Sequence, residues 1–227
     1  MEVWQLLEHP NRLQSRAGSR MLTLFQEPFS HWCVKAQKIL NYKHIKFESK
    51  NVGYHDKREL IKATGQDYVP AISHEGKIIT YPDIPDYLEK LSPDPTIYPS
   101  GTRDLAKLIE NWAHYRLEDI VWRYCVVDFP ETFKDDLERW VFVEIQEIKR
   151  GPLELMATRR PAFKADMEAH FQIIDRMLHN HKFLIAEAPS LADFATFGAI
   201  YPLRYSGNEI PREFKHLQAW YDTIDRI

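Results

Sequence analysis

Few local features restrict the fold of this chain as strongly as the Val69-Pro70 step. Proline has no amide hydrogen to give to a sheet, so Pro70 must open a strand or lie at a sheet edge. The run that follows, residues 71–79, has the pattern of a strand, a Glu75-Gly76 turn and a second strand. A bond before proline is also the one at which a cis peptide is readily adopted. A cis bond here would turn the backbone groups of Val69 outward, toward a ligand.

A second motif lies upstream, where Ser30-His31-Trp32-Cys33 stands between a predicted strand and a predicted helix. A small nucleophile at a helix N-terminus that is followed by Val-Pro resembles the thioredoxin-like domain of the glutathione S-transferase superfamily. Either motif alone indicates no more than a capping serine or a turn proline. Both together, in this order, favour the family.

The order of the predicted elements agrees with this resemblance. Alternating and helical patterns predict the sequence β-α-β-α-β-β-α over residues 21–92. The segments are strand 22–25, helix 30–42, strand 45–49, helix 59–63, a strand opened by Pro70, strand 77–80 and helix 87–91. We therefore expect an α/β thioredoxin-like domain.

The remaining segments divide the chain further. Residues 93–102 are rich in proline and form the predicted linker, and residues 103–227 carry long helical patterns typical of an all-α domain. Residues 1–20 are interpreted as an N-terminal extension or the product of an upstream start codon. The resemblance thus implies the two-domain glutathione S-transferase fold.

Ser190 and Asp193 form the strongest local signal in the helical part. Serine followed three residues later by an acid is a variant of the capping box, in which each side chain accepts from the other residue's amide. The N-capping motif of a core helix in glutathione transferases looks like this. We expect the pair to serve folding rather than catalysis.

Charge and composition exclude several classes of function. The 227 residues carry a formal net charge of -3, which gives no basic field for nucleic acid and no polybasic patch for a membrane. No apolar run is long enough to span a bilayer. The two cysteines are far apart in sequence, which indicates a reducing compartment, and we expect a cytoplasmic protein. The histidines show no metal-ligand spacing, so no metal site is predicted.

Ser30 and Cys33 are the candidate catalytic residues. The resemblance places Ser30 where many relatives have a catalytic serine or cysteine, whose group stabilises the thiolate of glutathione at the helix N-terminus. The alternative is that Ser30 only caps the helix. Cys33 could form mixed disulfides if its pKa were lowered in the first helical turn, or it could be a buried and inert thiol.

The resemblance also implies a glutathione site that this sequence changes. Val69 and Pro70 would pair with the cysteinyl backbone, and His55 lies in a loop where some relatives place a basic residue near the glycyl carboxylate. Relatives hold the γ-glutamyl end with an acid followed by serine, but no alignment of residues 79–86 yields that pair. Asp83 is the carboxylate that could replace it. The sequence leaves open whether glutathione binds at all.

The first predicted helix of the C-terminal domain offers a second-substrate pocket. Four residues share a face at helical spacing: Trp112, Tyr115, Arg116 and Asp119. Charged residues among aromatics indicate a polar or carboxylate-bearing substrate, anchored by Arg116 or Arg123. The alternative is a network of salt bridges under the domain interface.

Three hypotheses for function follow. The leading one is a glutathione-dependent transferase or lyase that acts on a small electrophile and uses Ser30. The second is a non-catalytic, protein-binding member of the fold, and the third is a thiol oxidoreductase that depends on Cys33. The resemblance further implies a two-fold homodimer.

Overall fold

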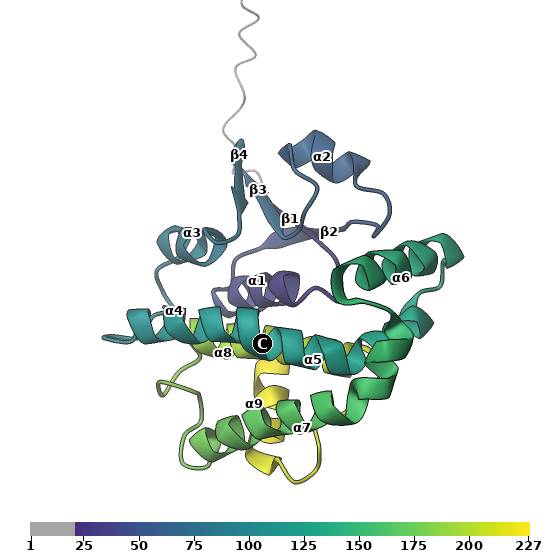
Figure 1. The fold of residues 1–227 in the computed structure, drawn as a ribbon. Helices are drawn as coiled ribbons and strands as arrows, with labels where there is room; N and C mark the ends of the chain where they lie inside the picture. Colours follow the sequence, from purple (N-terminus) through teal and green to yellow (C-terminus); the bar gives the residue numbers. More distant parts are fainter. Residues whose placement is uncertain (1–20) are drawn as a thin grey trace, which may run out of the picture.

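The computed structural model describes residues 21–227, and the predicted extension 1–20 lies outside the described residues. A small sheet with three helices stands over a group of helices (Figure 1). The first part contains β1 (Leu22–Gln26), α1 (His31–Tyr42), β2 (Phe47–Asn51), α2 (Arg58–Thr64), β3 (Ala71–His74), β4 (Lys77–Thr80) and α3 (Ile84–Leu91). This order confirms the predicted β-α-β-α-β-β-α arrangement.

The second part is entirely helical within the described residues. Its elements are α4 (Arg103–Trp112), the π-helix η1 (Ala113–Leu117), α5 (Glu118–Cys125), the 3₁₀-helix η2 (Val126–Thr132), α6 (Asp136–Arg150), α7 (Leu153–Leu178), α8 (Leu191–Tyr205) and α9 (Lys215–Asp225). The predicted linker, residues 93–102, falls between α3 and α4. None of the described helices is long and apolar enough to cross a membrane.

The sheet is mixed, with strand order β2-β1-β3-β4. β1 runs parallel to β2, while β3 is antiparallel to both β1 and β4. The Val69-Pro70 bond is cis, as predicted. Glu75 and Gly76 both have positive φ, the geometry of a two-residue hairpin turn, and they join β3 to β4.

Two predicted elements differ in their limits. β2 begins at Phe47 rather than Ile45, because the Ile45 amide still bonds to the carbonyl of Leu40 as the chain leaves α1. α3 begins at Ile84 rather than Tyr87, and Pro85 lies in its first turn, where a missing amide hydrogen costs nothing. Boundaries predicted from sequence commonly differ by a few residues, and both differences are of this size.

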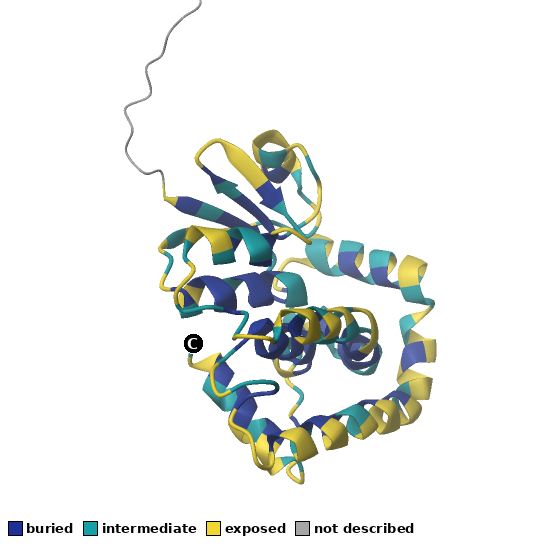
Figure 2. Ribbon diagram, turned by 90° about the vertical axis from the view of Figure 1, so that its left-hand side faces the viewer, coloured by how far each residue is buried: buried dark blue, intermediate teal, exposed yellow. Residues whose placement is uncertain are grey.

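α8 is the centre of the hydrophobic core and connects the two parts. Almost all of its side chains are buried, and it packs against α1 as well as α4 and α5 (Figure 2). Gly198 allows the closest approach, because a Cβ there would lie 2.6 Å from the carbonyl oxygen of His31. The predicted capping box is present at the start of α8, where the Asp193 carboxylate accepts from the Ser190 amide at 3.0 Å. The core helix thereby fixes the backbone on which Ser30 and His31 stand.

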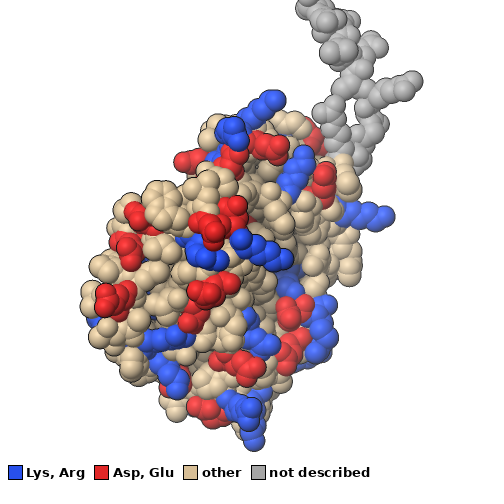
Figure 3. All heavy atoms as spheres, turned by 90° about the vertical axis from the view of Figure 1, so that its right-hand side faces the viewer, with Lys and Arg blue, Asp and Glu red and all other residues tan. Residues whose placement is uncertain are grey.

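α6 lies apart from the other helices and beside the sheet part (Figures 1 and 2). The Tyr54 amide, in the loop between β2 and α2, donates to Glu138 Oε1 at 2.9 Å. The helix is as predicted, but its exposed side carries Leu137, Trp140 and Ile148. Phe142 and Gln146 are its buried residues instead. On the face of the molecule shown in Figure 3, acidic and basic side chains are interspersed without a field of one sign.

Candidate active site beside Ser30

Ser30 stands at the junction between a tight turn and α1. Its amide donates to the carbonyl of Glu27 at 3.1 Å, and its carbonyl accepts from Val34 at 2.9 Å, which starts the helix. Its side chain makes no hydrogen bond to the helix amides. The hydroxyl therefore does not cap the helix; its neighbour in the protein is the Cys33 thiol.

A cavity of about 160 Å³ opens at Ser30, and we call it the Ser30 cavity. It lies between the turn after β1, the β2–α2 loop and the helices α5 and α6. Its lining residues are Glu27, Phe29, Ser30, His31, Tyr54, Glu118, Trp122, Gln146, Lys149 and Arg150. The cavity is small and its lining is mainly polar and charged, with aromatic side chains from Phe29, Tyr54 and Trp122.

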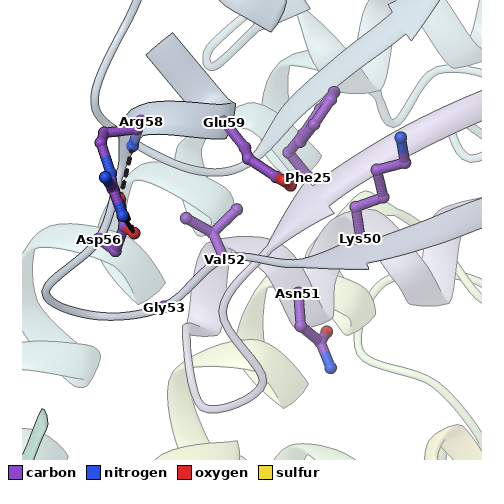
Figure 4. A pocket seen from close by; sticks show the side chains of 8 residues that line it. All are labelled: Phe25, Lys50, Asn51, Val52, Gly53, Asp56, Arg58 and Glu59. Atoms are coloured by element: carbon purple, nitrogen blue, oxygen red, sulfur yellow. Dashed lines mark hydrogen bonds and ion pairs between the residues drawn. The ribbon is translucent and has the colours of Figure 1, made fainter. Parts of the chain in front are cut away.

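A larger hollow of about 440 Å³ lies between the end of β2 and α2 (Figure 4). Arg58 and Asp56 form an exposed ion pair at its rim, with Arg58 Nε 2.9 Å from Asp56 Oδ1. None of the residues predicted for the site lines this hollow. We place the candidate site at the Ser30 cavity because that is where a nucleophile-stabilising group and a helix N-terminus meet.

Cys33 points away from the Ser30 cavity into the core. Its side chain is buried, and its Sγ accepts from the Glu27 amide at 3.4 Å. Burial raises the pKa of this thiol to about 12, against a smaller opposing effect from hydrogen bonding to Ser30. A thiol in this state is protonated at neutral pH, so the structure favours the buried and inert alternative.

Two histidines and a glutamate form a chain that ends in the Ser30 cavity. His31 Nε2 lies 3.1 Å from His114 Nδ1, and His31 Nδ1 lies 3.5 Å from Glu118 Oε1. Burial lowers the pKa of His31 well below its usual value, and it lowers the pKa of His114 to about 3. Burial also raises the pKa of Glu118 to about 7. At neutral pH both imidazoles are uncharged, and Glu118 is close to its midpoint.

The π-helix η1 interrupts the predicted second-substrate face. A π turn has one more residue than an α turn, so every side chain after it is rotated relative to those before it. Glu118 and Trp122, which follow η1, line the Ser30 cavity, and Trp112, Tyr115, Arg116 and Asp119 do not.

The structure places those four residues elsewhere on the helical part. The Trp112 ring packs against His170, and Tyr115 is exposed. Arg116 is exposed as well, and Asp119 Oδ2 binds Arg123 Nε at 2.8 Å. Their assignment to a substrate pocket stays a prediction.

The residues predicted to hold glutathione lie on loops of the sheet part, outside the lining of the Ser30 cavity. Val69 is half-buried and Pro70 is buried before β3. Asp83 is exposed at the start of α3, and its side chain does not cap the helix. His55 is exposed, with Nδ1 3.4 Å from Glu138 Oε1.

The missing acid-serine pair is replaced by an aromatic cluster. The Tyr81 ring packs against Trp32, and Trp32 also contacts His114. Lys35 Nζ lies 4.6 Å from the ring centroid of Trp32 and 4.4 Å from that of Tyr81, while its charge is paired with Glu110 at 2.7 Å. Tyr81 therefore presents a ring at the position where the resemblance implied an acid followed by serine.

The part of the site that sequence reasoning missed comes from α5 and α6. Gln146 accepts from Trp122 Nε1 at 3.0 Å and donates to the Tyr54 hydroxyl at 3.0 Å. Arg150 Nη1 donates to Gln146 Oε1 at 2.8 Å. Because these contacts join segments far apart in sequence, no local motif could have revealed them. The burial of Gln146 in α6 is visible only in the structure.

Comparisons with known proteins agree with this architecture. The family model of the glutathione S-transferase N-terminal domain matches residues 24–96, and that of the C-terminal domain matches residues 150–227. A search of curated protein sequences found no significant match.

Solved structures share the fold at low identity. A glutathione S-transferase of Ceriporiopsis subvermispora in complex with glutathione is 17% identical, with a TM-score of 0.77 over 91% of this chain and 97% of that one. Glutaredoxin 2 of Salmonella typhimurium in complex with glutathione is 19% identical, with a TM-score of 0.75 over 92% and 94%. The β-etherase LigF of Sphingobium is 18% identical, with a TM-score of 0.67 over 91% and 96%. Together with both domain matches, these likenesses show that the chain belongs to the glutathione S-transferase superfamily, with a thioredoxin-like domain followed by an all-helical one.

Proposed function

We propose that the protein is a glutathione-dependent enzyme of the transferase or lyase type that acts on a small electrophilic substrate. The observation that carries the proposal is the Ser30 hydroxyl, which is not used for capping and opens onto a cavity at the N-terminus of α1. A hydroxyl and helix amides in this position favour a bound thiolate over the thiol. Two relatives of the same fold are complexes with glutathione, which supports the choice of co-substrate.

The proposed reaction uses few groups of the protein. The glutathione thiol loses its proton to solvent water, and the Ser30 hydroxyl donates a hydrogen bond to the resulting thiolate. The sulfur electron pair then forms a bond to the electrophilic carbon, and the leaving group departs with the electrons of the bond that breaks. Val69 would pair with the cysteinyl backbone of glutathione. Asp83 would meet its ammonium group, and His55 its glycyl carboxylate.

The alternatives differ in their support. The aromatic cluster around Tyr81, which replaces the acid-serine pair, favours a non-catalytic member of the fold. An oxidoreductase that depends on Cys33 is disfavoured, because that thiol is buried and its pKa is raised. The unpaired state of both cysteines, Cys33 and Cys125, fits the proposed cytoplasmic location, where glutathione is kept reduced.

Calorimetry with glutathione, followed by product formation on a panel of small electrophiles, tests the proposal. We expect Ser30→Ala to lower turnover and to raise the pH at which the bound thiolate forms, with little change in glutathione affinity. Asp83→Ala should mainly weaken binding. Ser49→Ala changes an exposed serine of β2 and is the matched control. Absence of both glutathione binding and product at millimolar glutathione would leave the non-catalytic alternative.

A further inference from the structure

The charges that line the Ser30 cavity do not balance. Glu27 is paired with Lys57, and His31 is uncharged because burial lowers its pKa. Glu118 is the only other acid in the lining. Lys149 and Arg150, by contrast, form no ion pair with any acid in the part of the chain that the structure describes. The cavity thus holds an excess of positive charge next to Ser30.

Arg150 is held in a fixed orientation at this position. Its Nη1 donates to Gln146 Oε1 at 2.8 Å, and its guanidinium lies 5.6 Å from the centroid of the Trp122 ring. Gln146 is fixed in turn by Trp122 and Tyr54. A guanidinium that is oriented before a ligand arrives loses little side-chain entropy on binding, and it can bind a planar anion with two parallel hydrogen bonds.

One donor of this guanidinium is left unsatisfied. Arg150 Nε is buried and has no hydrogen-bond acceptor among the described residues. Leaving a buried donor unpaired destabilises the folded protein, and more so for a charged group. The position of Arg150 in the last turn of α6 favours a positive charge there, because the helix dipole is negative at its C-terminal end. Because Nε has almost no accessible surface, a ligand in the cavity would meet the terminal Nη groups of Arg150 rather than this atom.

We infer that the electrophilic substrate carries a carboxylate, or an anion of the same planar shape, which Arg150 binds while the reacting carbon faces Ser30. This inference rests on the proposed function. The sequence pointed to Arg116 or Arg123 as such an anchor, but Arg116 is exposed and Arg123 is already paired with Asp119. Phe29 and Trp122 form apolar walls in a cavity of about 160 Å³, which suits a compact aromatic or short aliphatic acid.

Glu118 does not prevent the binding of an anion. Its pKa is already raised to about 7 by burial, and a second negative charge in the cavity would raise the pKa further. A bound carboxylate therefore favours the protonated, uncharged form of Glu118, and proton uptake by Glu118 relieves the repulsion between the two acids.

A matched pair of electrophiles tests the inference. The value of kcat/KM is measured with glutathione and either para-chloromethylbenzoate or its neutral amide, para-chloromethylbenzamide. The native protein should prefer the acid by roughly 10- to 100-fold, the range expected for a buried pair of this kind. Arg150→Gln should abolish the preference, and Arg150→Lys should keep part of it. Arg176→Gln, which removes an exposed arginine of α7, should keep all of it. An unchanged ratio of acid to amide in Arg150→Gln would overturn the inference.

Binding without glutathione separates this inference from the proposed function. Calorimetry with para-toluate and para-toluamide measures recognition of the carboxylate alone, and circular dichroism with thermal unfolding establishes that each variant is folded. If glutathione does not bind but para-toluate binds only when Arg150 is present, the proposed function fails and the anion site stands. If the native protein conjugates glutathione to the benzoate and to the benzamide with the same kcat/KM, the proposed function stands and the anion site fails.

Discussion

At the scale of single residues, the contrast between Ser30 and Cys33 decides which group can assist a thiolate. The two lie three positions apart in the first turn of α1. The Ser30 side chain lines a cavity, whereas the Cys33 side chain packs under the turn after β1. Local sequence identified both residues as candidates, because both types are compatible with the motif. Only the packing of the turn against α1 distinguishes them.

The first prediction concerns the thiols. Neither Cys33 nor Cys125 should react with Ellman's reagent in the folded protein, because both are buried and burial raises both pKa values. Both should react once denaturant unfolds the chain. Cys33→Ala should keep turnover within about threefold of the native protein, since the thiol contacts no substrate. Rapid modification of one thiol together with loss of activity would instead support the oxidoreductase alternative.

The second prediction concerns Glu118 and pH. Burial raises its pKa from 4.5 to about 7, so between these values the folded protein holds a proton that the unfolded chain has released. The contribution of Glu118 to the free energy of unfolding therefore falls as pH rises, by about 1.4 kcal/mol per pH unit at most. Glu118→Gln removes this dependence, and the variant should gain stability relative to the native protein between about pH 5 and about pH 7.

Urea unfolding at several pH values measures this difference. Glu154→Gln, which changes an exposed acid of α7 and leaves the Ser30 cavity untouched, is the matched control and should not reproduce the trend. A difference between Glu118→Gln and the native protein that stays constant with pH would show that Glu118 is ionised throughout this range.

At the scale of elements, the start of α8 depends on one buried carboxylate. Asp193 accepts hydrogen bonds from the amides of Leu184 and Ser190, the Ser190 hydroxyl and Trp220 Nε1, at 2.8–3.0 Å. The sequence predicted the bond to Ser190 from spacing alone. The bonds to Leu184 and Trp220 join three segments of the fold, and spacing does not reveal them.

The third prediction follows from these bonds. Asp193→Ala should lower the free energy of unfolding by about 3 kcal/mol or more, because four buried donors lose their acceptor. Turnover per folded molecule should be unchanged.

Asp175→Ala is the matched control. Among the described residues, this half-buried acid accepts hydrogen bonds from two amides at the start of α9, and its loss should cost about 1 kcal/mol. Urea unfolding measures both variants, and a fully stable Asp193→Ala protein with reduced turnover would place Asp193 in the active site.

α4, η1 and α6 show why part of the site could not be predicted. Even helical spacing from Trp112 to Arg123 does not detect the π turn of η1, and the residues of this segment that line the Ser30 cavity are Glu118 and Trp122. The apolar pattern of α6 predicts a helix but not its location. Its contact with Tyr54 depends on tertiary packing of the β2–α2 loop, and that contact brings Gln146 and Arg150 to the cavity.

At the scale of the whole molecule, the sequence was most informative where local chemistry dictates backbone geometry. Pro70, the Glu75-Gly76 turn and the Ser190 capping box each determine a short segment, and together they establish the order of strands and helices. The cavity instead arises from side chains that meet across both domains. The fold of this protein could therefore be predicted from the sequence more successfully than its substrate.

The last prediction concerns assembly. Because family resemblance implies a two-fold dimer, we expect light scattering at micromolar concentration to give the mass of two chains. Three large apolar side chains on α4 and η1 are exposed to solvent: Leu105 (48%), Leu108 (65%) and Tyr115 (65%). Large apolar side chains that are exposed together on neighbouring turns are typical of a surface that another protein covers. Leu108→Glu should shift the protein to the mass of one chain, because a second copy cannot bury the new charge cheaply. Leu155→Glu, on the exposed side of α7, should leave the dimer intact. If the native protein has the mass of one chain, the expectation of a dimer is wrong. If the Leu108→Glu variant is still a dimer, the interface lies elsewhere on the protein.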